Sequence, residues 1–469
     1  MSPQPNAVSF EQAQTALARE IKTVLRHRNG HATSTIITPS VALEDMDALA
    51  WMHANPGAAR VYWSGRDDGL EAAGIGIAHS CCESFAGDLL GLREQLGPPL
   101  TTCSAGIRYY GGIRFDLRLP YEPHWETFGA WSFILPRFEL RRCNGQAKLR
   151  CNLNLPRDYG NQDRIVEDLY GLNAETVPVD LPKPLSHAYR PSRAEWRTVV
   201  DSLLRTIGQS PLEKIVLARE TRVVCAGGPD PVTLLRLLKS GTPRCFHFLF
   251  QPAGQSAFIG ASPERLFRRR NRDVETEAVA GSRPRGRSAA DDARLVEELL
   301  NSDKERREHE FVRVSLKEDM LPLSTDLQMD ADCSVMRLAS ARHLVSRMKA
   351  RLRRGVTSLD VLEAIHPSPA VGGLPSSLAL DALLKIEPFD RGWYAGPVGW
   401  IGPNAAEFAV GIRSGLIHGQ QVRLYSGAGI VPGSTWQSEW DEIGDKIVDF
   451  SRVLGISTQE DAAHQAAAG

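Results

Sequence analysis

The sequence lacks the features that mark extracellular, membrane-spanning and disulfide-rich proteins. It has eight cysteines in 469 residues and no CxxC pair, so neither a disulfide framework nor a structural zinc site is indicated. No stretch approaches the roughly 18 consecutive apolar residues of a membrane span. Residues 1–25 contain no basic segment followed by an apolar run, which argues against a secretory signal. We therefore expect a cytoplasmic protein with reduced thiols and no membrane partner.

The sequence also lacks an excess of charge of either sign. Lys plus Arg is 55 and Asp plus Glu is 56, so the formal charge is 55 − 56 = −1, which gives no argument for a polyanionic partner. Two basic runs, 265–272 and 348–354, leave nucleic-acid binding as an alternative of a different class, but we expect solvated loops there. With 42% hydrophobic and 24% charged residues, the chain is predicted to fold, and not to be intrinsically disordered.

The common catalytic motifs are missing as well. There is no GxGxxG after a strand, no GxxxxGK[ST], no HExxH and no GxSxG. The usual anchors of nucleotide-binding proteins, zinc proteases and serine hydrolases are therefore absent. What remains is a set of carboxylate-rich helices, glycine strings and isolated cations.

Hydrophobic patterning predicts a mixture of helices and strands. Helices are expected at 7–28, at 192–207 after a capping box of Ser192 and Glu195, at 289–320 and at 438–454. Strands that alternate apolar and polar residues follow one another through short turns, and this pattern favours an α+β protein with antiparallel sheets flanked by helices. The expected strands are 60–63, 73–77, two pieces within 109–116, 132–142 and 148–155 as a hairpin, 213–225, 245–252, 256–263, 273–281, 392–402, 406–417 and 421–431.

The length suits two to three domains or one large unit, and we expect the latter. A proline-rich stretch at 173–191 looks like a connector. We therefore predict an N-terminal portion (1–190) packed on a catalytic core (191–458), followed by a disordered tail (459–469).

Two predicted helices carry paired carboxylates. Glu305 and Glu308 are three residues apart and share one helix face, and Glu439 and Glu442 repeat that spacing. Each pair, taken alone, is most simply explained as part of a solvent-exposed helix face. Two such pairs facing one another would supply the carboxylate oxygens that Mg²⁺ prefers.

Three further features suit a pocket for an anionic ligand. Gly427 and Gly429 would let the backbone turn so that amide N–H groups point at an anion, or they serve a tight connection. Arg413 interrupts an apolar strand, where a cation is costly unless paired, although an exposed position also fits. Lys214 opens another apolar strand; a desolvated lysine can act as a general base, while a lysine with its ammonium in solvent is the commoner case.

Taken in order along residues 192–458, the sequence resembles the chorismate-utilising enzymes. This family includes isochorismate synthase, salicylate synthase, anthranilate synthase component I and aminodeoxychorismate synthase. The resemblance implies the fold of anthranilate synthase component I. The strings that carry it are KIVLARE (214–220), GASPERLF (260–267), AVAGSRPRG (278–286), KERREHEFV (304–312), HPSPAVGG (366–373), RGWYAGPVG (391–399), IRSGL (412–416) and YSGAGIVPGS…EWDEIGDK (425–446).

The resemblance implies a role for each residue. Glu308 and Glu442 match the direct ligands of Mg²⁺, and Glu305 and Glu439 match carboxylates that act through waters. Lys214 matches the general base that adds water at C2 of chorismate, and Glu264 matches the general acid at the departing C4 hydroxyl. The residues matched to substrate binding are Ala280, Gly281, Ser282, His366, Tyr394, Arg413, Gly427, Ala428, Gly429 and Lys446.

Within the family, Lys214 favours isochorismate synthase, because the ammonia-using enzymes typically lack that lysine. Aminodeoxychorismate synthases carry another lysine where this chain has Ala280, and Ser282 replaces a threonine of several members but keeps its hydroxyl. N-terminal strings at 111–116 and 133–140 also resemble the isochorismate synthase branch.

Salicylate synthase, which goes on to eliminate pyruvate, stays the main alternative, and anthranilate synthase component I is a weaker one. The sequence leaves open a monomer or a homodimer. It also leaves open whether the product serves menaquinone, a catechol siderophore or salicylate.

Overall fold

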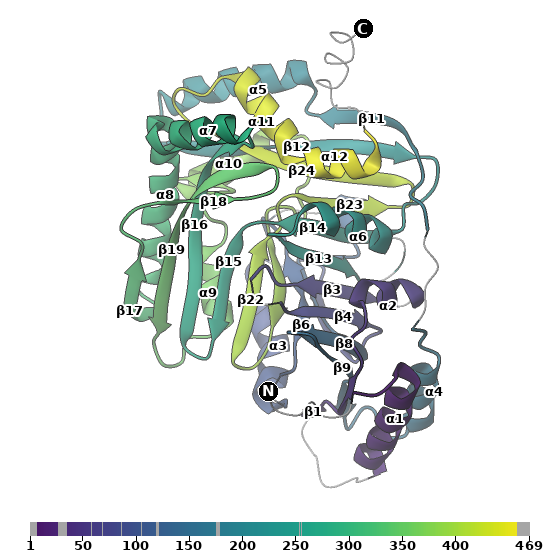
Figure 1. The fold of residues 1–469 in the computed structure, drawn as a ribbon. Helices are drawn as coiled ribbons and strands as arrows, with labels where there is room; N and C mark the ends of the chain where they lie inside the picture. The colour runs from purple at the N-terminus through teal and green to yellow at the C-terminus, as the bar shows by residue number, and fades with distance from the viewer. Residues whose placement is uncertain are drawn as a thin grey trace.

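The computed structural model describes residues 7–26, 35–57, 59–67, 69–85, 87–104, 106–118, 122–174, 179–252, 254 and 256–456. Within these ranges two large antiparallel sheets form the centre of the molecule, and helices cover their outer faces (Figure 1). The predicted α+β class is confirmed. The tail for which we predicted disorder, 459–469, lies outside the described residues.

The first sheet joins strands from both halves of the chain. Its order is β11-β12-β24-β23-β14-β13-β3-β4-β8-β9-β2, with β20 beside β12. Five strands from residues 1–151 thus continue a sheet whose other strands come from residues 184–430. The bounds are β2 (Ser40–Leu43), β3 (Arg60–Ser64), β4 (Glu71–Ile75), β8 (Phe138–Cys143), β9 (Gln146–Cys151), β11 (Pro184–Arg190), β12 (Lys214–Cys225), β13 (Phe246–Gln251), β14 (Ser256–Ser262), β20 (Gly373–Leu374), β23 (Ser414–His418) and β24 (Gln421–Ile430).

The second sheet has the order β17-β19-β16-β15-β22-β21-β6-β7-β5, with β18 beside β19. Its bounds are β5 (His79–Glu83), β6 (Tyr109–Ile113), β7 (Trp131–Leu135), β15 (Arg265–Arg270), β16 (Asp273–Pro284), β17 (Ser324–Met329), β18 (Ser334–Arg337), β19 (Ala341–Leu352), β21 (Pro397–Ile401) and β22 (Ala405–Val410). A separate pair is formed by β1 (Thr35–Ile37) and β10 (Leu153–Leu155).

The helices cover the sheets and the end of the molecule that carries α1. They are α1 (Phe10–Arg26), α2 (Ala48–Ala54), α3 (Leu90–Thr102), α4 (Gln162–Tyr170), α5 (Arg193–Ile207), α6 (Pro231–Gly241), α7 (Ala289–Asn301), α8 (Asp303–Met320), α9 (Ser358–Ile365), α10 (Ser376–Ile386), α11 (Trp436–Lys446) and α12 (Val448–Leu454), with a 3₁₀ turn at Pro123–Trp125. In the described part of the chain, no helix combines the length and apolarity needed to span a bilayer.

Two predicted helices are each broken into two. The helix expected at 289–320 is α7 and α8, because Ser302 adopts an extended backbone and its side chain caps the second helix. The helix expected at 438–454 is α11 and α12, which meet at Ile447. The capping box of Ser192 and Glu195 is confirmed at the start of α5.

The strand expected at 406–417 is also two strands, and they belong to different sheets. β22 ends at Val410 in the second sheet, and β23 begins at Ser414 in the first. Gly411 lies so close to the chain at Trp393 that an added Cβ would come within 2.7 Å of its carbonyl oxygen. Arg413 has a left-handed backbone with φ of 46°. This crossing point between the sheets lies at the candidate site.

Three smaller predictions need correction. The expected connector at 173–191 contains β11, an edge strand of the first sheet. The piece expected at 392–402 is a strand only over β21. The basic runs at 265–272 and 348–354 fall largely on β15 and β19, so they are not loops. Arginines in both runs form ion pairs: Arg268 lies 2.5 Å from Glu275, and Arg351 lies 2.8 Å from Asp273.

Candidate active site

The predicted carboxylate pairs come together from two helices on different sheets. α8 packs against β16 of the second sheet, and α11 packs against β24 of the first. The connection is made by Ser282 on β16. Its backbone N–H donates to Glu305 Oε2 at 3.1 Å, and its hydroxyl donates to Glu442 Oε1 at 3.1 Å. Ser282, one of the residues matched to substrate binding, therefore contacts a carboxylate from each helix.

Each of three carboxylates is paired with a lysine. Lys446 lies 2.7 Å from Glu442, Lys304 lies 2.8 Å from Glu439, and Lys214 lies 2.9 Å from Glu308. Together with the contacts of Ser282, these pairs place four carboxylates and three ammonium groups in one cluster: Lys214, Lys304, Glu305, Glu308, Glu439, Glu442 and Lys446.

Like charges repel within this cluster. Burial, followed by the charge of Glu442, raises the pKa of Glu439. Burial acts in the same direction on Glu442, but Lys446 outweighs it and lowers the pKa of that carboxyl. Lys446 thus favours the ionised form of Glu442, which is the form of a carboxylate that binds a cation.

The donor chemistry suits a hard divalent cation. Glu439 is fully buried, and its Oε2 has no hydrogen-bond partner among the described residues. Carboxylate oxygens are the ligands that Mg²⁺ prefers. As arranged here, no three His, Cys, Asp or Glu side chains of the described part stand close enough to hold an ion together. The residues therefore fit such a cation by their chemistry, with lysines as their present partners.

A cavity in two connected parts adjoins the cluster. The inner part holds about 80 Å³ and the outer part about 550 Å³. The inner volume has room for about two or three water molecules, so a larger ligand would extend into the outer part. The residues that line both parts are Ser282, His343, Arg413, Glu442 and Lys446.

Glu264 lines the inner cavity, on the loop after β14. The side chain is buried, and burial followed by the charge of Glu277 raises the pKa of its carboxyl to about 8. The carboxyl is therefore protonated at neutral pH and can donate a proton, which suits the predicted general acid.

Lys214 lies behind the cavity wall. Its side chain is fully buried, and it is not among the residues that line the inner cavity. Its Nζ is 2.9 Å from Glu308 Oε1, yet the pair lacks the alignment of a hydrogen bond. Glu308 does line the cavity. Lys214 thus reaches the site beside a predicted metal ligand, with its hydrogen-bonding capacity still available.

The prediction that Gly427 and Gly429 form a turn with several amides pointing at an anion is wrong. Both lie within β24 and pair with β12, so the backbone there is extended. β23 begins only at Ser414, which pairs with Tyr425, and residues 426–430 therefore have no neighbour on that side. Lys446 donates to the Gly427 carbonyl at 2.8 Å on this open edge. Because the N–H and C=O of one extended residue point the same way, the Gly427 amide faces the cavity too.

These glycines matter because they leave space. A Cβ on Gly427 would lie 3.0 Å from the Tyr394 hydroxyl. A Cβ on Gly429 would lie 2.6 Å from Glu308 Oε1 and 3.1 Å from Lys214 Cε. The strand therefore passes directly beneath the predicted catalytic and metal-binding groups.

Gly429→Ala is expected to lower activity about tenfold, because the new methyl group displaces the Glu308 carboxylate, and to cost about 1–3 kcal/mol of stability. Gly444→Ala is the matched control, since a Cβ there meets nothing within 4 Å and should leave activity unchanged. The two variants should be compared by initial rate and by thermal unfolding. A Gly429→Ala enzyme with the wild-type rate would contradict the close approach of β24 to Glu308.

The remaining predicted residues divide into those at the cavity and those away from it. Ala280, Gly281, Tyr394 and Arg413 line the inner cavity. Ala428 is buried in β24 and does not line it.

The structure does not bring His366 to the cavity with them. It ends α9, its Nε2 lies 3.2 Å from the Phe115 carbonyl, and it lines a different cavity. The histidine that lines the cavity is His343 of β19.

Sequence reasoning missed two contributors. Lys304 directly precedes Glu305, so the carboxylate spacing could have led to it. His343 lies in the apolar strand β19, and nothing in its spacing distinguishes it from an ordinary buried histidine.

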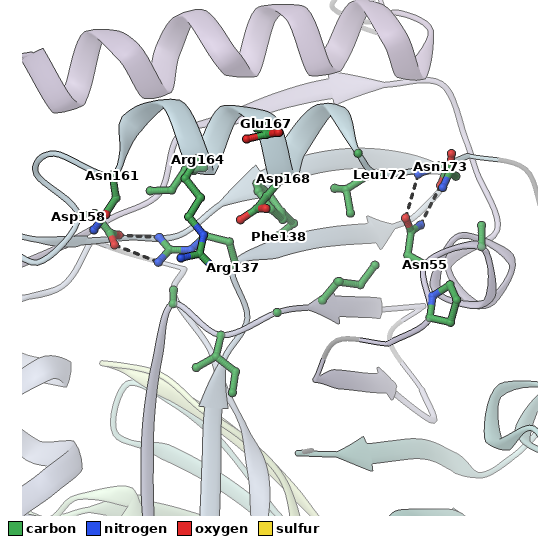
Figure 2. Close-up of a pocket in the computed structure, with 18 of the residues that line it drawn as sticks. Asn55, Arg137, Phe138, Asp158, Asn161, Arg164, Glu167, Asp168, Leu172 and Asn173 are labelled. Atoms are coloured by element: carbon green, nitrogen blue, oxygen red, sulfur yellow. Dashed lines mark hydrogen bonds and ion pairs between the residues drawn. The ribbon is translucent and has the colours of Figure 1, made fainter. Parts of the chain in front are cut away.

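A larger cavity of about 820 Å³ lies against α4, at the end of the molecule that carries α1 (Figures 1 and 2). Two contacts join polar groups of its lining: Arg137 contacts Asp158 at 2.5 Å, and Asn55 donates to the Asn173 carbonyl at 2.8 Å. None of the predicted site residues lines it. The predicted catalytic and binding residues therefore lie at the two smaller cavities and not at this one.

Comparison with known proteins agrees with the fold and the motifs. The sequence profile of a family described as "Chorismate binding enzyme" matches residues 19–455. Isochorismate synthase 2, chloroplastic, from Arabidopsis thaliana is 35% identical over 367 residues, 76% of this chain and 65% of that protein. The chain thus spans slightly less than two thirds of that relative. Isochorismate synthase MenF from Escherichia coli is 31% identical over 456 residues, 94% of this chain and 99% of that protein.

A solved structure extends this similarity to three dimensions. The menaquinone-specific isochorismate synthase MenF from Escherichia coli superposes with a TM-score of 0.81 at 29% identity, over 94% of this chain and 100% of that one. The similarity thus includes both large sheets and the N-terminal strands that continue the first of them.

Proposed function

The chain belongs to the chorismate-binding enzyme family, and from this premise we propose that it is an isochorismate synthase that converts chorismate to isochorismate with Mg²⁺. The observation that carries the proposal is a buried carboxyl, Glu264, whose pKa is raised by burial, in the same site as a buried lysine, Lys214. Water addition with loss of a hydroxyl needs both a base and an acid.

The reaction exchanges one hydroxyl position for another. Water adds at C2 of chorismate, the double bonds of the ring diene shift, and the C4 hydroxyl departs as water. We assign to Lys214 Nζ the removal of a proton from the attacking water, and this proton returns through solvent to Glu264 after the product has formed. Glu264 gives its carboxyl proton to the departing hydroxyl, which is otherwise a poor leaving group. Atoms and charge balance, because one water enters and one leaves.

The substrate carries two carboxylates, and the cavity offers complementary groups. Arg413, Lys446 and the Gly427 amide face one part of it, and we assign the enolpyruvyl carboxylate to them. The 280–282 turn lies beside Glu305 and Glu442, and we assign the ring carboxylate to that side. Preorganised donors of this kind stabilise charge as it develops.

Glu308 and Glu442 are the residues that we propose hold Mg²⁺, with Glu305 and Glu439 acting through waters. When bound, the ion would neutralise the ring carboxylate and stabilise charge that spreads into the ring. Lys446 and Lys304, which now balance these carboxylates, would then share that task with the ion.

Glu442→Gln is expected to raise the Mg²⁺ concentration for half-maximal activity roughly 10- to 100-fold, because a charged ligand is replaced by a neutral one. The measurement is the initial rate as Mg²⁺ is titrated. Glu298→Gln, on the exposed face of α7, is the control. An unchanged Mg²⁺ requirement would remove Glu442 from the metal site.

The experiment that tests the proposed function is product identification from chorismate, with and without Mg²⁺. We expect isochorismate, only with Mg²⁺, and no pyruvate. Pyruvate released without an added lyase would instead identify a salicylate synthase. Anthranilate formed with ammonia would identify the ammonia-using branch.

We also propose that residues 1–190 and 191–458 act as one unit. The support for this proposal is the first sheet, in which β3 from the N-terminal portion pairs with β13 from the core along five residues of each strand.

A further inference from the structure

His343 connects two parts of the cavity wall that come from different sheets. It lies on β19, opposite Ser282 of β16, at the bulge that makes room for Gly281. Its Nδ1 is 3.3 Å from the Gly281 carbonyl oxygen, and its Nε2 is 3.4 Å from Arg413 Nη2. The side chain is 8% exposed and lines both parts of the cavity.

These two partners define one tautomer of the ring. A carbonyl oxygen only accepts hydrogen bonds, so Nδ1 must carry the proton that is donated to Gly281. A guanidinium only donates, so Nε2 must be unprotonated and accept the hydrogen bond from Arg413 with its lone pair. A doubly protonated ring would direct an N–H at a cation. Burial, then Arg413 and Lys446, lower the pKa of His343 to about 3, in agreement with a neutral ring.

Both partners of His343 hold unusual backbone conformations. Gly281 has φ of 74°, and a Cβ there would lie 3.1 Å from Glu305 Oε2. Arg413 has φ of 46°, which costs free energy in a residue with a side chain. Such conformations persist only where neighbouring contacts hold them. The side chain of Arg413 is held by three contacts of its guanidinium: Ser340 Oγ at 3.2 Å, Asp449 Oδ2 at 3.9 Å and His343.

We propose that His343 is a positioning residue that sets the Arg413 guanidinium relative to the 280–282 turn. The inference deepens the proposed function, because it rests on these two elements holding the two carboxylates of one substrate. A neutral acceptor suits this place, since it fixes the guanidinium and withdraws none of its charge. A second carboxylate beside Asp449 would offset more of the Arg413 charge, and a second cation would repel it.

Three substitutions separate the two contacts. Gln places its amide oxygen near the Nε2 position and retains the acceptor for Arg413. Asn reaches only the Nδ1 position and retains the donor to Gly281. Leu retains neither. We expect His343→Leu and His343→Asn to raise the KM for chorismate about 10- to 100-fold, as for lost hydrogen bonds to charged groups, and His343→Gln to restore it to within about threefold of wild type. The turnover number should fall less than KM rises.

A double-mutant cycle distinguishes positioning from a general structural role. If His343 acts through Arg413, His343→Leu should change KM less than about twofold in an Arg413→Met enzyme. Equal effects in both backgrounds would overturn the proposal. His247→Leu is the matched control: it removes another buried neutral histidine, bonded to Thr242, and should lower stability without raising KM.

A second measurement does not depend on the reaction. In the full chain with ¹⁵N-labelled histidine, the His343 signal, assigned by its loss in His343→Gln, should report the Nδ1–H tautomer without change from pH 5 to 9. The opposite tautomer, or titration in that range, would overturn the proposal. If no variant, wild type included, converts chorismate, the proposed function fails, while the tautomer still decides the geometry of His343.

Discussion

Lys214→Ala is expected to reduce the conversion of chorismate to isochorismate by about 10²- to 10⁴-fold, the usual contribution of a general base. The lysine is the group at this site that can take a proton from water next to Glu308, and alanine leaves no group to replace it. Lys214→Arg should be equally inactive, because a guanidinium stays protonated. Product formation with saturating Mg²⁺ is the measurement. Wild-type activity in either variant would refute the base assignment.

The effect must be separated from a loss of stability. Lys214 is fully buried, and removing one member of a buried ion pair costs about 3–5 kcal/mol. Lys239→Met is the matched control, because it breaks another Lys–Glu pair, that with Glu71 at 2.7 Å, away from the cavity. Both variants should lower the unfolding temperature, while only the Lys214 variant should lose activity.

Glu264→Gln is expected to lower activity by a similar factor, because an amide keeps the shape of the acid but cannot give up a proton to the departing hydroxyl. Glu264→Asp keeps the acid and shortens its reach, so partial activity is expected there. Rates should be measured near pH 7, where the wild-type carboxyl is protonated. A fully active Gln variant would show that another group protonates the leaving hydroxyl.

The pH dependence follows from the same residue. Burial, then Glu277, raise the pKa of Glu264 to about 8, so the acid form is lost above that pH. In the wild type kcat/KM should fall about tenfold per pH unit above pH 8, and the small residual rate of Glu264→Gln should lack this decline.

The stability of the chain should follow the same titration. The carboxyl has an ordinary pKa of 4.5, so its raised folded pKa makes a contribution that is complete below pH 4.5. This contribution is lost as pH rises through about 8. The free energy of unfolding should therefore depend less on pH in Glu264→Gln than in the wild type.

Much of the fold could be predicted because its signals are local. The capping box of Ser192 and Glu195, the apolar run near the start of β12 and the turn between the expected strands 132–142 and 148–155 each act over a few residues. The errors occurred where a contact distant in the sequence overrides the local pattern. The apolar run at 406–417 reads as one strand, but the close approach of Gly411 to Trp393 sends its two halves into different sheets.

The candidate site shows the same division between local sequence signals and contacts that are distant in the sequence. The spacing of Glu305, Glu308, Glu439 and Glu442 and the resemblance to a family were sufficient to name its carboxylates and its two proposed proton-transfer residues. The tertiary structure decided which groups they meet. It places three lysines on three of these carboxylates and leaves His366 outside the cavity.

By itself the sequence determined the α+β class, the family and the identity of the charged residues, because these depend on periodicity and on motifs read along the chain. Only the tertiary structure decided that Lys214 stands behind Glu308, that Glu264 is buried enough to stay protonated, and that His343 joins Gly281 to Arg413. The physical reason is that pKa values and hydrogen-bond partners depend on distances across two sheets, whose meeting point no local pattern of residues specifies.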